Sequence, residues 1–154
     1  MSDGLKPDLR ACTPDELKEL MAALSEPGYR AGQLFEWMSR PVRGADELSN
    51  LPAGLKQQLA GWRVSGAVQA RKQVSGQDGT VKYLWELDDG ECVESVVMRY
   101  RHGLSICIST QAGCRMGCSF CASAIGGKVR DLTAGEMAAQ IIFAQVDLGE
   151  RISN

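Results

Sequence analysis

The chain has 154 residues, a formal net charge of −2, 44% hydrophobic and 23% charged residues, which is typical of one globular domain or two small ones. No apolar run approaches the roughly 18 residues of a membrane span, and no signal peptide is visible, so we expect a cytoplasmic protein without a membrane anchor. The segment from Met98 to Arg130 carries +5, so the rest carries −7; its basic residues are Arg99, Arg101, Arg115, Lys128 and Arg130. Such a segment favours a phosphate-bearing partner, although a solvated face with scattered arginines is the alternative.

The first 62 residues predict a small helical domain. Residues 1–12 show no hydrophobic period and are expected to form a loose lead. Thr13 and Glu16 have the spacing of a capping box, and Pro14 suits the first helical position, so a helix should begin there. Its apolar face follows at helical spacing and consists of Leu17, Leu20, Met21 and Leu24.

Two more short helices are predicted before residue 62. One runs from Tyr29 to Ser39, ahead of Pro41, and should bury Leu34, Phe35, Trp37 and Met38. The other should be capped by Ser49 or Asn50 and should bury Leu51, Leu55 and Leu59. These helices predict one helical domain over residues 1–62, and a bundle of this size is close to the lower limit for folding alone.

From residue 63 the pattern changes to strands. Segments 68–74, 80–87 and 91–100 are strand-like and are separated by turn sequences, which predicts an antiparallel β-ribbon over residues 63–102. In the third strand Glu94 shares a face with Val96 and Met98. Burial on that face would raise the pKa of Glu94 and make it a useful base. An exposed strand carboxylate is at least as good an interpretation.

The remaining residues predict one strand, one loop and one helix. Leu104–Ser109 is a short apolar strand with an unpaired edge, and Thr133 with Glu136 predicts the capping box of a helix that ends at Gly149. The expected buried face of that helix consists of Met137, Ile141, Ala144, Gln145 and Leu148. This is one βα unit of a parallel barrel, in which reactive groups lie at the C-terminal ends of strands. The fold class is therefore α+β.

The loop of this unit carries Cys114, Cys118 and Cys121 in the spacing C-x₃-C-x₂-C. Thiolates bind iron–sulfur clusters, and three of them suit a four-iron cluster with one open iron. A buried helical stripe is disfavoured by Gly113 and Gly117, because a mid-helix glycine costs about 1 kcal/mol. Zinc would need a fourth ligand and the chain has one histidine, and a disulfide framework would need a secretory context.

The neighbouring residues narrow this interpretation to a family. The cysteine spacing with Phe120 before the last cysteine resembles the signature of radical S-adenosylmethionine (SAM) enzymes. Segments 93–96, 105–111 and 120–123 resemble the RlmN/Cfr group of RNA adenine-C2 methyltransferases. The helical N-terminal part is similar to the accessory domain of that group. The chain is therefore interpreted as the N-terminal portion of such an enzyme.

The resemblance implies methylation of carbon 2 of an adenine in 23S ribosomal RNA, and also in transfer RNA. The implied cofactors are a 4Fe–4S cluster held by Cys114, Cys118 and Cys121, and SAM, which binds the open iron and is cleaved to a 5′-deoxyadenosyl radical. Phe120 falls at a SAM-binding position. An electron donor such as flavodoxin is an implied partner.

The resemblance also assigns two catalytic roles. Glu94 matches the proton acceptor of the family, and Cys107 matches the cysteine that pairs transiently with a methyl-carrying cysteine. From its residue type alone, Cys107 is also an ordinary buried strand cysteine. Cys12 and Cys92 match no family motif and are interpreted as structural or incidental.

Parts of such an enzyme are not found in this sequence. The methyl-carrying cysteine of the C-terminal region and the Gly-Glu-rich strand that helps to bind SAM are both missing. Residues 103–154 would form the start of a truncated radical SAM core, and we expect the chain to be inactive alone. The competing hypothesis is a standalone iron–sulfur module that binds RNA or transfers electrons without catalysis, although electron carriers usually use four cysteines.

Overall fold

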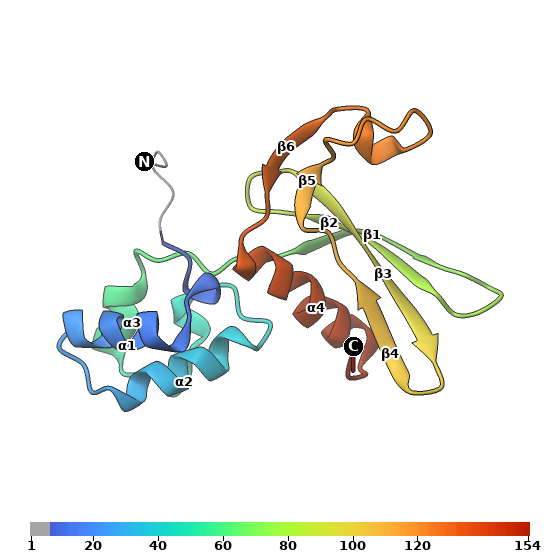
Figure 1. The fold of residues 1–154 in the computed structure, drawn as a ribbon. Coiled ribbons are helices and arrows are strands. Elements are labelled where there is room, and N and C mark those ends of the chain that lie inside the picture. The colour runs from blue at the N-terminus through green and yellow to red at the C-terminus, as the bar shows by residue number, and fades with distance from the viewer. Residues whose placement is uncertain (1–6) are drawn as a thin grey trace. The chain divides into compact units, whose positions relative to one another are not determined.

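The computed structural model describes residues 7–154, which form helices and antiparallel sheets in an α+β fold (Figure 1). The chain divides into two compact units, the first ending at Gly66 and the second comprising Ala67–Asn154. Within residues 7–154 no helix is long and apolar enough to cross a membrane.

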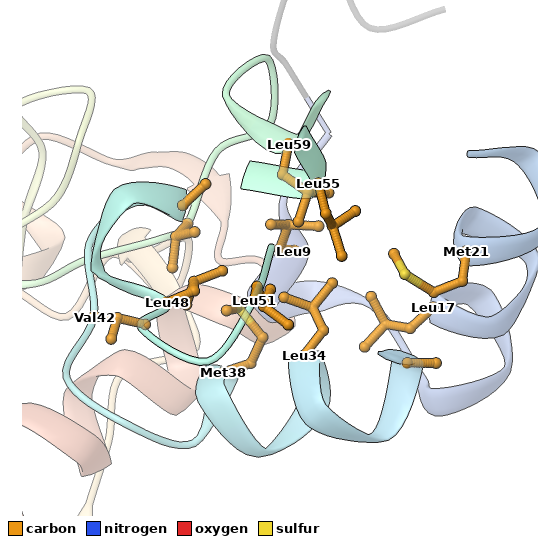
Figure 2. Close-up of a cluster of buried hydrophobic side chains, with 13 residues drawn as sticks. Leu9, Leu17, Met21, Leu34, Met38, Val42, Leu48, Leu51, Leu55 and Leu59 are labelled. Carbon is orange, nitrogen blue, oxygen red and sulfur yellow. The ribbon is translucent and has the colours of Figure 1, made fainter. Parts of the chain in front are cut away.

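Three helices and two short 3₁₀ turns build the first unit: η1 (Leu9–Ala11), α1 (Pro14–Ala23), α2 (Tyr29–Met38), η2 (Ala45–Glu47) and α3 (Ala53–Leu59). The capping box at the start of α1 is confirmed, because Thr13 Oγ1 accepts from the Glu16 N–H while the Glu16 carboxylate accepts from the Thr13 N–H at 2.7 Å. Figure 2 shows the core of this unit, in which leucines and methionines from all three helices meet.

The lead predicted over residues 1–12 is ordered where the structure describes it, and residues 1–6 lie outside the described residues. Leu9 is fully buried, and the buried Arg10 guanidinium donates to backbone carbonyls of Met38 at 3.0 Å and Val42 at 2.7 Å. It also donates to the carbonyl of Ser65. An arginine carries five N–H donors in a fixed geometry, so Arg10 can bond several backbone carbonyls at once. Such a role for a charged residue cannot be predicted from the hydrophobic pattern of the sequence.

Two details of the predicted helices were wrong. Phe35 is 42% exposed rather than buried, because α2 turns Leu34 and Met38 into the core instead. Neither Ser49 nor Asn50 caps α3, whose N-cap is Pro52 without a side-chain cap. The expected burial of Leu51, Leu55 and Leu59 is confirmed.

The second unit is a four-stranded antiparallel sheet in the order β1-β2-β3-β4, with strands β1 (Val68–Val74), β2 (Val81–Glu86), β3 (Cys92–Tyr100) and β4 (Gly103–Cys107). Helix α4 (Ala134–Leu148) covers one face of it (Figure 1). The residues on the covered face are Tyr83, Trp85, Val93, Ser95 and Val97, which are all buried. We call the opposite face the open face of the sheet; it carries Lys82, Leu84, Glu94, Val96 and Cys107.

The predicted βα unit is present, with two corrections. Strand β4 pairs with β3 and is therefore part of the ribbon's sheet. Its other edge is not left unpaired either, because the chain returns beside it after α4. Leu104 and Ile152 form a parallel bridge, and the Ile106 N–H donates to the Asn154 carbonyl at 2.8 Å. This parallel return after a helix is the local geometry of a βαβ arrangement.

Helix α4 has the predicted capping box at Thr133 and the predicted left-handed glycine at Gly149. Its buried face was predicted in part: Ala144 is buried, and Met137 and Leu148 are partly buried against the core. The buried Glu136, Ala139 and Gln140 were not expected. Glu136 and Gln140 are buried because each has hydrogen-bond partners: Arg130 bonds Glu136, and Ser95 and Ser109 bond Gln140.

Candidate active site beside the cysteine loop

The cysteine loop is held at its base by a small hairpin that the sequence did not predict. Strand β5 (Gln111–Gly113) pairs antiparallel with β6 (Lys128–Asp131), and the loop with its 3₁₀ turn η3 (Ala122–Ala124) lies between them (Figure 1). The Cys114 N–H donates to the Gly127 carbonyl at 3.0 Å. Gly113 has a φ of +69°, and a Cβ there would collide with the same carbonyl oxygen. Only glycine therefore fits this position without strain.

Cys114, Cys118 and Cys121 are free thiols that take no part in the core. The loop is built from turns, since the Cys121 N–H donates to the Cys118 carbonyl at 3.1 Å, so the buried helical stripe is excluded. Among residues 7–154 no three Cys, His, Asp or Glu side chains are grouped as a metal site, so the three sulfurs are not brought together here. Three accessible thiols on one loop nonetheless match the donor chemistry of a 4Fe–4S cluster.

A cleft of about 300 Å³ lies next to this loop. It is lined by β3, by β5 and by the stretch that follows the cysteines, including Cys92, Glu94, Ser109, Gln111 and Ser123. Apolar side chains of the loop are exposed nearby in sequence, above all Phe120, which is 91% exposed. The structure therefore places Glu94 on the wall of a cleft that also borders the segment after the cysteine loop.

Glu94 is not buried, so of the two interpretations of this strand carboxylate the exposed one is confirmed. Its side chain is 45% exposed and pairs with Lys82 at 2.6 Å. The strand alternation was right, because Glu94, Val96 and Met98 do share a face. That face is the open one, since α4 covers Val93, Ser95 and Val97 instead.

Cys107 lies on the same open face as Glu94. It is exposed rather than buried, and it stands directly opposite Val96 in the β3–β4 register. Glu94 is therefore its diagonal neighbour, at a spacing of about 7–8 Å in such pairs. The two residues to which the resemblance assigns catalytic roles are thus accessible from one side of the sheet.

A buried polar network that the sequence did not predict ties α4 to this region. The fully buried Gln140 side chain accepts from Ser95 Oγ at 2.7 Å and from the Ser109 N–H at 3.0 Å. It also donates to the Ser109 carbonyl at 2.9 Å, so both backbone groups of that residue are satisfied. Ser109 Oγ in turn donates to the Glu94 carbonyl at 2.7 Å. A glutamine between apolar residues in α4 was the available sequence signal.

Arg130 forms the second polar anchor. Its guanidinium bonds both carboxylate oxygens of Glu136 at 2.8 Å and pairs with Asp89 at 2.6 Å. Burial raises the pKa of Glu136, but the bonds and charge of Arg130 and the bonds from Thr133 outweigh this effect, so the net pKa is lowered. The pair joins β6, and with it the cysteine hairpin, to the start of α4.

The segment from Met98 to Arg130 offers less unpaired positive charge than its sequence suggested, because three of its five cations pair with carboxylates. Arg99 pairs with Glu150 at 2.8 Å, Lys128 pairs with Asp131 at 2.7 Å, and Arg130 is neutralised as described. Only Arg101 and Arg115 of that segment form no ion pair within the described chain.

The chain is similar to known proteins over nearly all of its length. A probable dual-specificity RNA methyltransferase RlmN from Alkaliphilus oremlandii is 47% identical over 150 residues, which is 97% of this chain and 44% of that protein. A protein of the same name from Symbiobacterium thermophilum is 50% identical over 90% of this chain and 38% of its own length. No model of a known protein family matches the chain.

A solved structure agrees with these relatives. The crystal structure of a radical SAM methyltransferase from Sphaerobacter thermophilus has a TM-score of 0.81 and 38% identity, over 96% of this chain and 45% of that one. The fold of this chain is thus similar to that of a radical SAM methyltransferase. In sequence it is similar to proteins named RlmN, and it spans less than half the length of the relatives it matches.

Proposed function

We propose that this chain is part of an RlmN-like enzyme that methylates carbon 2 of an adenine in 23S ribosomal RNA, and also in transfer RNA. The observation that carries the proposal is the position of Glu94 on the wall of a cleft beside the cysteine loop. The names of the relatives support an RNA substrate.

We assign the proposed roles to residues whose side chains are accessible at the site. Cys114, Cys118 and Cys121 would hold a 4Fe–4S cluster, and Phe120 would contact SAM. When bound, these two groups supply the radical that activates the methyl carbon. Glu94 would accept the proton from the adenine, and Cys107 would pair transiently with the methyl-carrying cysteine. The exposure of Glu94 and Cys107 on the same face of the sheet supports these two roles.

The proposal includes partners and a location. A cytoplasmic electron donor such as flavodoxin would reduce the cluster, and RNA would approach the open face of the sheet. We also propose that the chain is inactive by itself, because it spans less than half of the enzymes to which it is similar.

The test is anaerobic reconstitution of the purified chain with iron and sulfide. We expect a four-iron cluster that is lost in each of the variants Cys114→Ala, Cys118→Ala and Cys121→Ala. Cys12→Ala and Cys92→Ala serve as matched controls and should retain it. Iron content and visible absorption measure the cluster, and an undiminished cluster in Cys118→Ala would exclude the assignment.

A further inference from the structure

The open face of the sheet contains a second hollow that the proposed reaction does not use. It has a volume of about 140 Å³ and is lined by Arg71, Gln73, Lys82, Leu84 and Glu94. This is well below the roughly 300–1,000 Å³ of typical small-molecule sites, so the hollow suits one small group rather than a whole nucleotide. We call it the Arg71 pocket.

The pocket is formed by side chains that point away from α4. Arg71 stands opposite Leu84, and Leu84 stands opposite Glu94, so the three form one row across β1, β2 and β3. In the neighbouring row Lys82 faces Gln73 on one side and Val96 on the other, and Val96 faces Cys107. The pocket therefore lies on the face that carries both proposed catalytic residues.

The pocket is positively charged. Its two cations are Arg71 and Lys82, and its one carboxylate, Glu94, is already paired with Lys82. Arg71 is exposed and has no carboxylate partner among residues 7–154. The next basic residue of the strand, Lys72, points to the covered face and bonds Asp147 of α4 at 2.5 Å. Arg71 is thus left with a free guanidinium at a concave site.

We propose that the Arg71 pocket binds a phosphate of the RNA backbone next to the nucleotide that is methylated. A guanidinium offers paired donors that match phosphate oxygens, and the three N–H donors of an ammonium let Lys82 bond a phosphate while it keeps Glu94. Glu94 lines both this pocket and the cleft beside the cysteine loop. An RNA strand anchored in the pocket would therefore place its neighbouring base near Glu94, at the cleft beside the cysteine loop.

This inference rests on the proposed function for the nature of the ligand, because RNA is taken as the source of the phosphate. A backbone contact of this kind positions the RNA and does not read its sequence. It also contributes to the salt dependence of binding, by about 0.7 in the slope of log affinity against log salt for each single-strand phosphate contact.

The test measures binding of a fluorescently labelled RNA stem-loop to the whole 154-residue chain over a range of salt concentrations. We expect Arg71→Gln to lower the slope by about 0.7–0.9, equally for loops with and without an adenine. Arg71→Lys should restore most of the slope. Lys72→Gln is the matched control, since it removes the same charge one residue away on the other face, and it should leave the slope unchanged.

Each outcome decides the proposal. An unchanged slope in Arg71→Gln, or an equal loss in Lys72→Gln, overturns it. If the unaltered chain binds no RNA at any salt concentration, RNA binding by this chain fails along with the pocket. RNA binding that survives with an unchanged slope refutes the pocket alone. Thermal unfolding of each variant shows whether the sheet is intact.

Discussion

The exposed position of Glu94 makes its carboxylate accessible from solvent. Its carboxylate stays in contact with water and with Lys82 at 2.6 Å, and at the same time it reaches a cleft and a smaller pocket. A buried base would have to be uncovered before it met a nucleotide held in RNA. An exposed one on a rigid strand is already accessible to a substrate of that size.

At this scale we predict the effect of removing the carboxylate charge. In a full-length enzyme that contains this chain, Glu94→Gln should keep the cluster and lose methyl transfer by about 10²–10⁴-fold, because a positioned base contributes about that much. Single-turnover formation of 2-methyladenosine, measured by mass spectrometry, checks this. Glu91→Gln is the control, since Glu91 lines the same cleft. Rates equal to those of the unaltered enzyme would reduce Glu94 to an ordinary strand residue.

At the scale of elements, the β5–β6 hairpin holds the cysteine loop. We expect Gly113→Ala to abolish cluster reconstitution, because the new Cβ meets the Gly127 carbonyl and the φ of +69° is itself unfavourable for alanine. Gly117→Ala is the matched control. Gly117 has a similar φ of +66° but open space around its Cβ position, so it should lose about 1–2 kcal/mol of local stability and retain iron. Equal iron content in the two variants would contradict the role of this close approach.

The anchor between β6 and α4 should depend on pH. The pKa of Glu136 is lowered in the folded protein, so its stabilising contribution is present above the unfolded value of about 4.3 and is lost as the pH falls through the folded value. We expect Glu136→Gln to cost about 1–3 kcal/mol at neutral pH, because Arg130 is partly exposed and keeps Asp89.

Urea unfolding followed by circular dichroism at several pH values measures this difference. The gap between the unaltered chain and Glu136→Gln should shrink toward pH 4 and below. Glu19→Gln, which changes an exposed residue of α1, should show no such gap. A gap that stayed constant with pH would mean that the Arg130 pair contributes through packing rather than charge.

At the scale of the whole molecule, the relatives indicate how much of the machinery this chain holds. It spans 38–44% of the RlmN proteins and 45% of the radical SAM methyltransferase compared above. We predict that the reconstituted chain with reductant, SAM and unmethylated ribosomal RNA forms no 2-methyladenosine above a control without protein. Nucleoside digestion and mass spectrometry provide the measurement. Product above the control would show that the chain does not need the additional length of its relatives, or obtains the same function from a partner.

Local features of this molecule were predictable from the sequence. The two capping boxes, at Thr13 and Thr133, are formed as expected because they depend on residues only three positions apart. The three strands of the ribbon and the glycine that ends α4 follow from local preferences in the same way. The cysteine spacing and its flanking segments were also enough to predict the similarity to RlmN proteins and to a radical SAM methyltransferase.

Tertiary packing decided the rest of the site. Alternation along β3 shows that Glu94 and Val96 share a face, but a strand has two faces and only the docking of α4 determines which one is covered. The hydrogen bond between Gln140 and Ser109 and the ion pair between Arg130 and Asp89 join residues that are distant in the chain. The sequence by itself therefore determined the main helices, the strands of the ribbon, the cysteine loop and the resemblance to the RlmN proteins, because these depend on neighbouring residues. Only the tertiary structure decided that Glu94, Cys107 and Arg71 share an open face, because that depends on which surface the helix buries.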